Sequence, residues 1–73
     1  MSALLITPER GADIIKNKKP TGQYIFKEKG LIVAVDNTDG TVEVERFKLK
    51  SQYTKWFLGL PCKNAAGKWL NMR

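Results

Sequence analysis

A run of apolar, mostly β-branched residues in the middle of the chain constrains the fold more than any other feature. Residues 31–35 read Leu-Ile-Val-Ala-Val, after a turn signal at Lys29-Gly30. Residues 37–41 follow with the chemistry of a type I turn closed by a glycine bulge, in which Gly40 supplies the positive φ. A strand that is apolar on both faces is typical of a sheet centre with cover on each side. We therefore expect residues 31–35 to form a central strand.

Strand-forming segments flank this run. Residues 23–27 are rich in strand formers, and residues 41–47 alternate apolar and polar side chains, as in a strand with one exposed face. The sequence predicts a three-stranded antiparallel β-meander. Its last hairpin has two candidate registers: a three-residue turn opposes Val35 to Glu43, whereas a four-residue turn opposes Val35 to Val42 and aligns the valines better.

One helix is expected before this meander and one after it. Thr7 is a good N-cap and Pro8 suits the first helical position, so we expect a helix from Pro8 to about Asn17. Ser51 is a candidate N-cap for a second helix that ends at Gly59. The expected apolar face of the first helix contains Ala12, Ile14 and Ile15, and that of the second contains Leu49, Tyr53, Trp56, Phe57 and Leu60.

The last segment begins as a turn at residues 63–67 and continues as a short strand near residues 68–72, with a helical turn as the alternative. The expected fold is a single α+β domain over residues 1–73, with a three- or four-stranded antiparallel sheet and two short helices. The sheet and the second helix are expected to share a core of Ile25, Ile32, Val33, Val35, Val42, Val44, Trp56 and Phe57. Two short helices cover little area, so we also consider a homodimer contact over the second sheet face.

The residue inventory excludes most catalytic chemistry. The chain has no histidine and one cysteine, so Ser-His-Asp and Cys-His catalysis, mixed Cys/His zinc sites and an intrachain disulfide are all impossible. Cys62 is expected to be a small, semi-buried apolar residue. Glu43 and Glu45 fit a solvated strand face that pairs with Lys27 or Lys29 better than a catalytic pair. We predict no enzyme activity, no catalytic residues, no metal and no cofactor.

The charge is concentrated in one part of the sequence. The net charge is +6, yet residues 1–45 contain six Lys and Arg against seven Asp and Glu, whereas residues 46–73 contain seven Lys and Arg and no acid. Residues 46–73 also contain five of the seven aromatic residues. Segregation of this kind indicates a partner-binding surface. The candidate contact residues are Lys48, Lys50, Tyr53, Lys55, Lys63, Lys68, Trp69 and Arg73.

These candidates have a plainer interpretation. Tyr53, Trp56 and Phe57 also fit the core stripe of a helix whose lysines are merely solvated. Trp69 lies outside that stripe and near the end of the sequence, so it is better placed for exposure.

Three stretches of the sequence, residues 32–40, 44–47 and 53–57, together resemble small phage and prophage proteins of unknown function. The segment Trp56-Phe57-Leu58-Gly59-Leu60-Pro61 is similar to part of a small type I-F anti-CRISPR protein. These resemblances imply a phage-type accessory protein that binds and blocks a host defence complex. They transfer no functional residues to this sequence, because no motif matches at a known contact position.

Three functions follow from these features. The leading hypothesis is a non-catalytic, phage-type binding protein that inhibits or modulates a host defence or nucleic-acid-handling complex through its basic, aromatic C-terminal surface. The first alternative is direct DNA or RNA binding. The second is an oligomeric structural or assembly protein. No segment approaches the roughly 18 apolar residues of a membrane span, so we expect no membrane association. The single cysteine favours a reducing, intracellular setting, which for a phage-encoded protein is the cytoplasm of the host.

Overall fold

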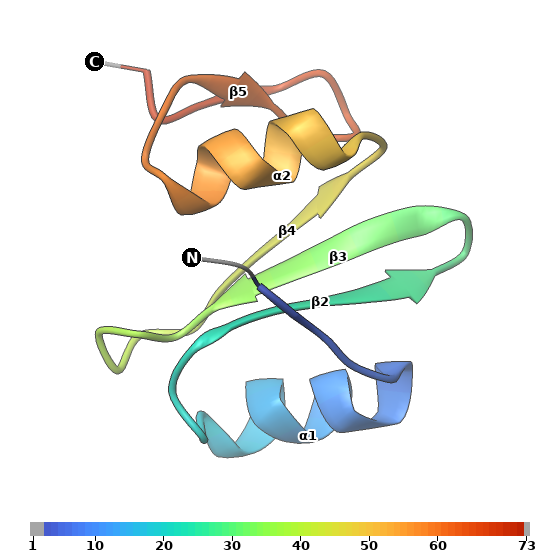
Figure 1. Cartoon of the computed structure of the whole chain (residues 1–73), viewed down its shortest axis with the longest axis vertical. Helices are drawn as coiled ribbons and strands as arrows, with labels where there is room; N and C mark the ends of the chain where they lie inside the picture. The colour runs from blue at the N-terminus through green and yellow to red at the C-terminus, as the bar shows by residue number, and fades with distance from the viewer. Residues whose placement is uncertain (1–2, 73) are drawn as a thin grey trace.

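A four-stranded sheet lies between two helices at the centre of the molecule (Figure 1). The computed structural model describes residues 3–72. In chain order the elements are β1 (Leu4–Leu5), α1 (Pro8–Asn17), β2 (Gln23–Glu28), β3 (Leu31–Asp36), β4 (Glu43–Phe47), α2 (Lys50–Phe57), β5 (Cys62–Lys63) and β6 (Trp69–Leu70). The main sheet has the order β1-β2-β3-β4, and β5 pairs with β6 in a separate hairpin. The predicted α+β class is confirmed.

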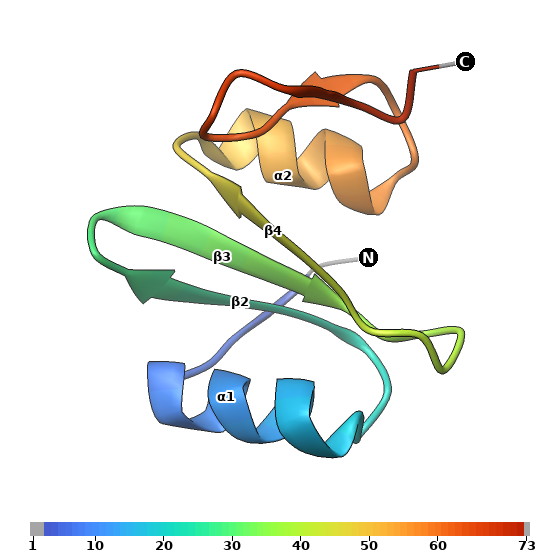
Figure 2. The ribbon, with the colours of Figure 1, turned by 180° about the vertical axis from the view of Figure 1, so that it is seen from behind.

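Strand β3 is internal and covered on both sides, as its sequence predicts. It pairs antiparallel with β2 and with β4. Helix α1 covers one face of the sheet, and α2 together with the β5–β6 hairpin covers the other (Figures 1 and 2). The chain itself therefore supplies cover on both faces, which removes the argument for a dimer contact over a bare second face.

Strand β1 was not predicted, and it changes the sheet from antiparallel to mixed. It runs parallel to β2, with Leu4 opposite Tyr24 and Leu5 opposite Ile25. The Ile6 backbone N–H continues the pairing by donating to the Ile25 carbonyl oxygen at 2.9 Å. A parallel partner has to come from a distant part of the chain, here across α1, and no local turn signal announces it.

The register of β3 and β4 differs from both predicted alternatives. Val35 lies opposite Val44, and Asp36 lies opposite Glu43. The predicted turn is present, because the Gly40 N–H donates to the Asn37 carbonyl oxygen at 3.2 Å and Gly40 has φ 86°. Two further residues, 41 and 42, stay outside the ladder and lengthen the connection. The valines are aligned, but by a longer loop than the sequence suggested.

Asn37 explains why the loop starts where it does. Its side chain is fully buried, and its Oδ1 accepts from the Gly22 N–H at 2.7 Å while its Nδ2 donates to the Pro20 carbonyl oxygen at 3.2 Å. Asn37 is thereby bound to the segment that enters β2. These bonds fix the connection between α1 and β2 against the end of β3.

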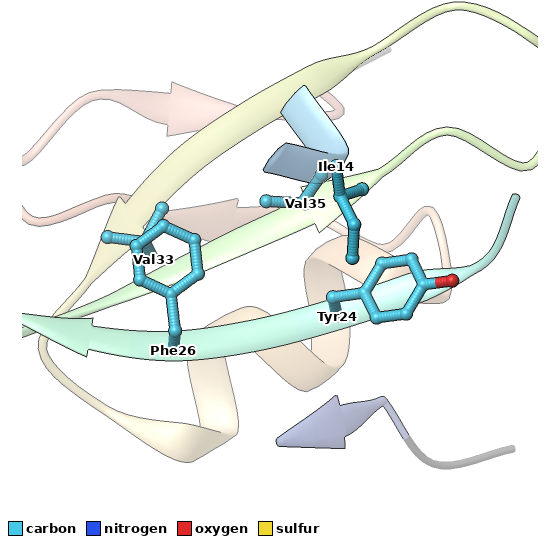
Figure 3. Close-up of a cluster of buried hydrophobic side chains, with 5 residues drawn as sticks. All are labelled: Ile14, Tyr24, Phe26, Val33 and Val35. Atoms are coloured by element: carbon cyan, nitrogen blue, oxygen red, sulfur yellow. The ribbon is translucent and has the colours of Figure 1, made fainter. Parts of the chain in front are cut away.

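The core under α1 is made by side chains from the helix and the two inner strands. Ile14 of α1 packs over Tyr24, Phe26, Val33 and Val35 (Figure 3). Helix α1 has the predicted bounds, and the Thr7 side chain accepts from the Arg10 N–H at 3.1 Å.

Gly11, and not Ala12, is the other buried position on the inner face of α1. Ala12 is exposed, which corrects the predicted apolar face. A Cβ at Gly11 would lie 2.4 Å from Cε1 of Phe26, so only glycine allows the helix to approach this ring.

The core under α2 is separate from the first one. Its buried members are Ala34, Phe47, Tyr53 and Cys62, and the half-buried side chains packed against them are Ile25, Ile32, Trp56, Phe57 and Leu70. The single predicted core is therefore divided by the sheet, with Val33, Val35, Val42 and Val44 on the α1 side. Leu49 and Leu60 are exposed and do not belong to the stripe of α2, because they lie just beyond the helix ends.

The ends of α2 are only partly as predicted. The N-cap is Leu49, which has no side-chain capping bond, so Ser51 is already helical and is not the cap. At the other end Gly59 has φ 75°, and the N–H groups of Gly59 and Leu60 donate to the carbonyl oxygens of Trp56 and Lys55 at 3.1 and 2.9 Å. This is the glycine-terminated cap that the sequence predicts.

Candidate binding surface

The predicted contact residues separate into exposed and buried members. The five described lysines of the set, Lys48, Lys50, Lys55, Lys63 and Lys68, are all exposed. Arg73 lies outside the described residues. Trp69 is 53% exposed, in agreement with the prediction.

Tyr53 is buried and has to be removed from the predicted surface. It is 9% exposed and belongs to the core under α2, where its ring lies edge-on to Phe57 with the centroids 6.2 Å apart. The interpretation of the α2 aromatics as a core stripe is therefore correct for Tyr53. A tyrosine so enclosed cannot stack on a base without opening the core.

Three connections that are far apart in the sequence lie at one end of the molecule. They are the turn between β2 and β3, the passage from β4 into α2, and the turn between β5 and β6 (Figures 1 and 2). Exposed lysines occur at each of them, and we call this region the lysine end; it comprises Lys27, Lys29, Lys48, Lys50 and Lys68. The first turn of α1, with Glu9, lies at the same end but in the layer below the sheet.

Three of these lysines line one surface hollow. Lys27, Lys29 and Lys48 border a space of about 470 Å³ beside the β2–β3 turn. Glu28 also lines it, and its Oε1 lies 3.8 Å from Nη2 of Arg46, a partly exposed ion pair. Because Arg46 partly offsets the one acid in this lining, the three ammonium groups give the hollow a positive character.

Lys27 and Lys29 are not among the predicted contact residues, because they belong to the nearly neutral first 45 residues of the sequence. The sheet register brings them to Lys48: Lys27 lies opposite Ile32, Ile32 lies opposite Phe47, and Lys48 follows Phe47 in the chain. The proximity of these lysines follows from the register of three strands. The distribution of charge along the sequence does not contain this information.

The β5–β6 turn is hydrogen-bonded to strand β4 of the sheet. The Asn64 Oδ1 accepts from the backbone N–H groups of Ala66 and Lys68 at 3.0 and 2.9 Å, and its Nδ2 donates to Oε2 of Glu45 at 3.1 Å. The Ala65 N–H donates to the Arg46 carbonyl oxygen at 2.7 Å. Lys68 therefore lies in a turn whose backbone is hydrogen-bonded to Asn64 and to β4.

Glu45 does not pair with Lys27 or Lys29 as predicted. It is half-buried, and the Asn64 amide satisfies it. Glu43 is exposed, as expected for a solvated strand position.

Lys63 and Lys55 come from other elements: Lys63 is in β5, immediately before the β5–β6 turn, and Lys55 is in α2. Lys63 is opposite Trp69 in the small hairpin, and its Nζ lies 5.1 Å from the centroid of the indole ring. This contact is a cation–π interaction, so one part of the exposed indole is already engaged. Lys55 is exposed on α2, and its charge acts on the Cys62 thiol. The predicted basic residues thus come from the lysine end, from β5 and from α2.

Cys62 is almost completely buried, as its sequence context suggested. Burial raises the pKa of its thiol, the negative charge of Glu45 raises it further, and Lys55 opposes both effects. The thiol form is therefore favoured at neutral pH, which is the behaviour of a structural cysteine.

Within residues 3–72 no group of three or more Cys, Asp or Glu side chains is arranged to hold a metal ion. Neither helix is long and apolar enough to cross a membrane, as far as the described residues go. No protein-family model, no curated protein and no solved structure matches the chain.

Proposed function

We propose that this chain is a non-catalytic binding protein that docks through its lysine end on the phosphate-bearing surface of a nucleic-acid-handling complex. The main support is the convergence of lysines from three separate connections on one end of the molecule, three of them around one hollow. Clustered, exposed ammonium groups attract polyanions, and phosphate contacts provide most of the non-specific affinity of proteins for nucleic acids.

The resemblance to phage and prophage proteins supports a setting for this activity. The complex would belong to the host cell, in its cytoplasm, and the bound protein would inhibit or modulate it. The similarity of residues 56–61 to an anti-CRISPR segment supports a defence complex as the target.

Direct binding to free DNA or RNA is the second candidate, and one observation favours it. Trp69 is exposed beside Lys63 on the small hairpin, and an exposed indole next to an ammonium group can stack on an unpaired base while the lysine contacts a phosphate.

Salt titration with matched charge variants tests the proposal. Fluorescence anisotropy would measure the affinity for labelled single-stranded and duplex oligonucleotides at increasing salt. In one variant Lys27, Lys29 and Lys48 are changed to Gln, and in the control Lys16, Lys18 and Lys19, near the end of α1, are changed to Gln. The two variants have the same net charge. Each phosphate contact contributes about 0.7–0.9 to the slope of log affinity against log salt, so we expect the first variant to lose about 2–3 units of slope and the control to lose little.

A capture experiment distinguishes the two candidate functions. Immobilised wild-type protein and the lysine-end variant would be incubated with host lysate, with and without nuclease. Under the leading proposal, the wild-type protein captures a defined host complex, and the lysine-end variant captures it poorly. Oligonucleotide binding without such a complex would favour the second candidate. Equal behaviour of both triple variants in the two assays would show that the lysine end is not a binding surface.

A further inference from the structure

An apolar groove runs along α2 on the side away from the β5–β6 hairpin. It has a volume of about 480 Å³, and its apolar lining comes from Ala3, Ile25, Tyr53, Phe57 and Leu58. Its floor is formed by β2 and the residue before β1, and its wall by α2 from its first residue to its C-cap. Leu58 stands 64% exposed at the far end. The groove exists because α2 covers β3 and β4 and leaves the β1–β2 side of the sheet partly open.

The edge strand beside this groove is β1, and the opposite edge strand is β4. β4 is covered at one end by the β5–β6 turn, through the bond from the Ala65 N–H to the Arg46 carbonyl oxygen. In the described part of the chain, β1 is the other edge strand, and its Leu4 and Leu5 are 61% and 65% exposed. An edge strand next to an apolar groove is the geometry that accepts an added extended segment.

The charges around the groove indicate which kind of segment binds in it. Among the described residues that line it, Lys50 alone is charged, and the chain as a whole has a net charge of +6. A second copy of this chain would bring a further net charge of +6 and its own Lys50 to the contact, which opposes self-association. An extended segment with apolar side chains toward the groove and carboxylates toward Lys50 satisfies both the apolar lining and the charge.

We infer that this groove and the β1 edge form a second binding site, for an extended, acidic segment of a partner protein. The segment lies beside β1, places alternate apolar side chains against Ile25, Phe57 and Leu58, and pairs a carboxylate with Lys50. This site is separate from the phosphate-binding role proposed for the lysine end. Only Lys50 belongs to both regions.

A pair of synthetic peptides tests the inference. The first has valine and leucine at alternate positions, with a glutamate on the same face at the end that meets Lys50, and the second replaces that glutamate with lysine. We expect the acidic peptide to bind measurably and the basic peptide to bind at least about tenfold more weakly, because it brings like charge to Lys50. Backbone amide shifts in NMR spectra should change at β1, at Ile25 and along α2.

Matched variants locate the site. Leu58→Glu puts a carboxylate in the groove at an exposed position, so it should weaken binding of the acidic peptide by about tenfold without loss of the fold. Leu60→Glu makes the same change at an exposed leucine outside the described lining and should change the affinity by less than about twofold. Equal effects of the two substitutions, or equal affinity for the two peptides, would overturn the inference. So would a concentration-dependent dimer in gel filtration that Leu58→Glu abolishes, because a second copy would then occupy the groove.

The two proposals fail separately. The variant with Lys27, Lys29 and Lys48 changed to Gln should bind the acidic peptide normally, since none of these residues lines the groove. Leu58→Glu should retain oligonucleotide binding if that activity exists. Loss of both activities in either variant would indicate misfolding, which circular dichroism would detect, and Leu58→Ala would then serve as the milder groove variant.

Discussion

The two faces of the central sheet are covered in different ways. On the α1 face the helix is capped by Thr7 and packs so closely that Gly11 meets the Phe26 ring. On the α2 face the helix has no side-chain N-cap, shares its cover with a small hairpin and leaves an apolar groove along one side. The α2 helix also begins at the lysine end, which the α1 layer adjoins only through Glu9 and its neighbours. The α1 face therefore serves stability, while the α2 face combines a closed core with an accessible margin.

The largest expected effect tests whether the α2 face has a closed core at all. Phe47 is 0% exposed and packs against Trp56, with ring centroids 5.8 Å apart. Phe47→Ala should lower the free energy of unfolding by about 3–5 kcal/mol, as much as Phe26→Ala on the other face. Phe57→Ala, at the half-buried margin, should cost only about 1–2 kcal/mol. Urea unfolding followed by tryptophan fluorescence measures all three. Equal costs at Phe47 and Phe57 would contradict the distinction between core and margin.

A smaller effect tests the close packing of the α1 face. Gly→Ala inside an exposed helix stabilises by about 1 kcal/mol. At Gly11 we expect the opposite sign, a loss of about 1–3 kcal/mol, because the new Cβ would overlap the buried Phe26 ring. The double variant Gly11→Ala with Phe26→Leu should recover part of that loss relative to Phe26→Leu alone. A stabilising Gly11→Ala would show that the ring moves freely and that the face is not tightly packed.

The helix starts provide a third comparison. Thr7→Ala removes the hydroxyl that accepts from the Arg10 N–H and should cost about 1 kcal/mol. Ser51→Ala should be nearly neutral, since Ser51 is inside α2 and makes no capping bond. Thermal unfolding by circular dichroism gives both values. A larger loss of stability for Ser51→Ala than for Thr7→Ala would contradict the assignment of Thr7 as a cap and of Ser51 as an interior residue of α2.

The smallest effect concerns pH and the core under α2. The pKa of the Cys62 thiol is raised in the folded protein, first by burial and then by Glu45. As pH rises above the ordinary thiol value, the unfolded chain loses this proton before the folded protein does, so stability falls. The stability contribution is fully present below that pH and is lost as pH approaches the raised value.

Comparison with Cys62→Ala separates this effect from the titration of lysines and tyrosines. The variant should lose less stability than the wild type between neutral and alkaline pH, as measured by urea unfolding at each pH. If the wild type and Cys62→Ala lost equal stability as the pH rises, the thiol would be accessible to water and this core would be open.

Local features were predictable from the sequence, and contacts between distant segments were not. Thr7 and Pro8 define the start of α1 without help from the rest of the chain, and Gly59 defines the end of α2 in the same way. The pairing of β1 with β2 depends on a two-residue segment that has no turn to announce it. The connection between α1 and β2 is bound by the Asn37 side chain, which hydrogen-bonds to Gly22 and Pro20, fifteen and seventeen residues away.

The candidate surface follows the same division. The exposure of Trp69 could be predicted from its position outside the helical stripe, and that of Lys48, Lys50 and Lys68 from their charge. The proximity of Lys27 and Lys29 to Lys48 depends on the three-strand register, and the groove depends on the packing of α2 against the sheet. Both are properties of the tertiary structure, so the distribution of charge along the sequence identifies only part of the candidate surface.

The order of the elements has a consequence for how the protein is made. The helix that covers one face precedes the inner strands, and the helix that covers the other follows them. A chain growing from its N-terminus can therefore pack α1 against β2 and β3 while Ile25, Ile32 and Ala34 still face solvent. Such a chain exposes an apolar sheet face until α2 is complete. Lys27, Lys29 and Lys48 lie at one end of the sheet, and their mutual repulsion would oppose pairing of two unfinished chains there.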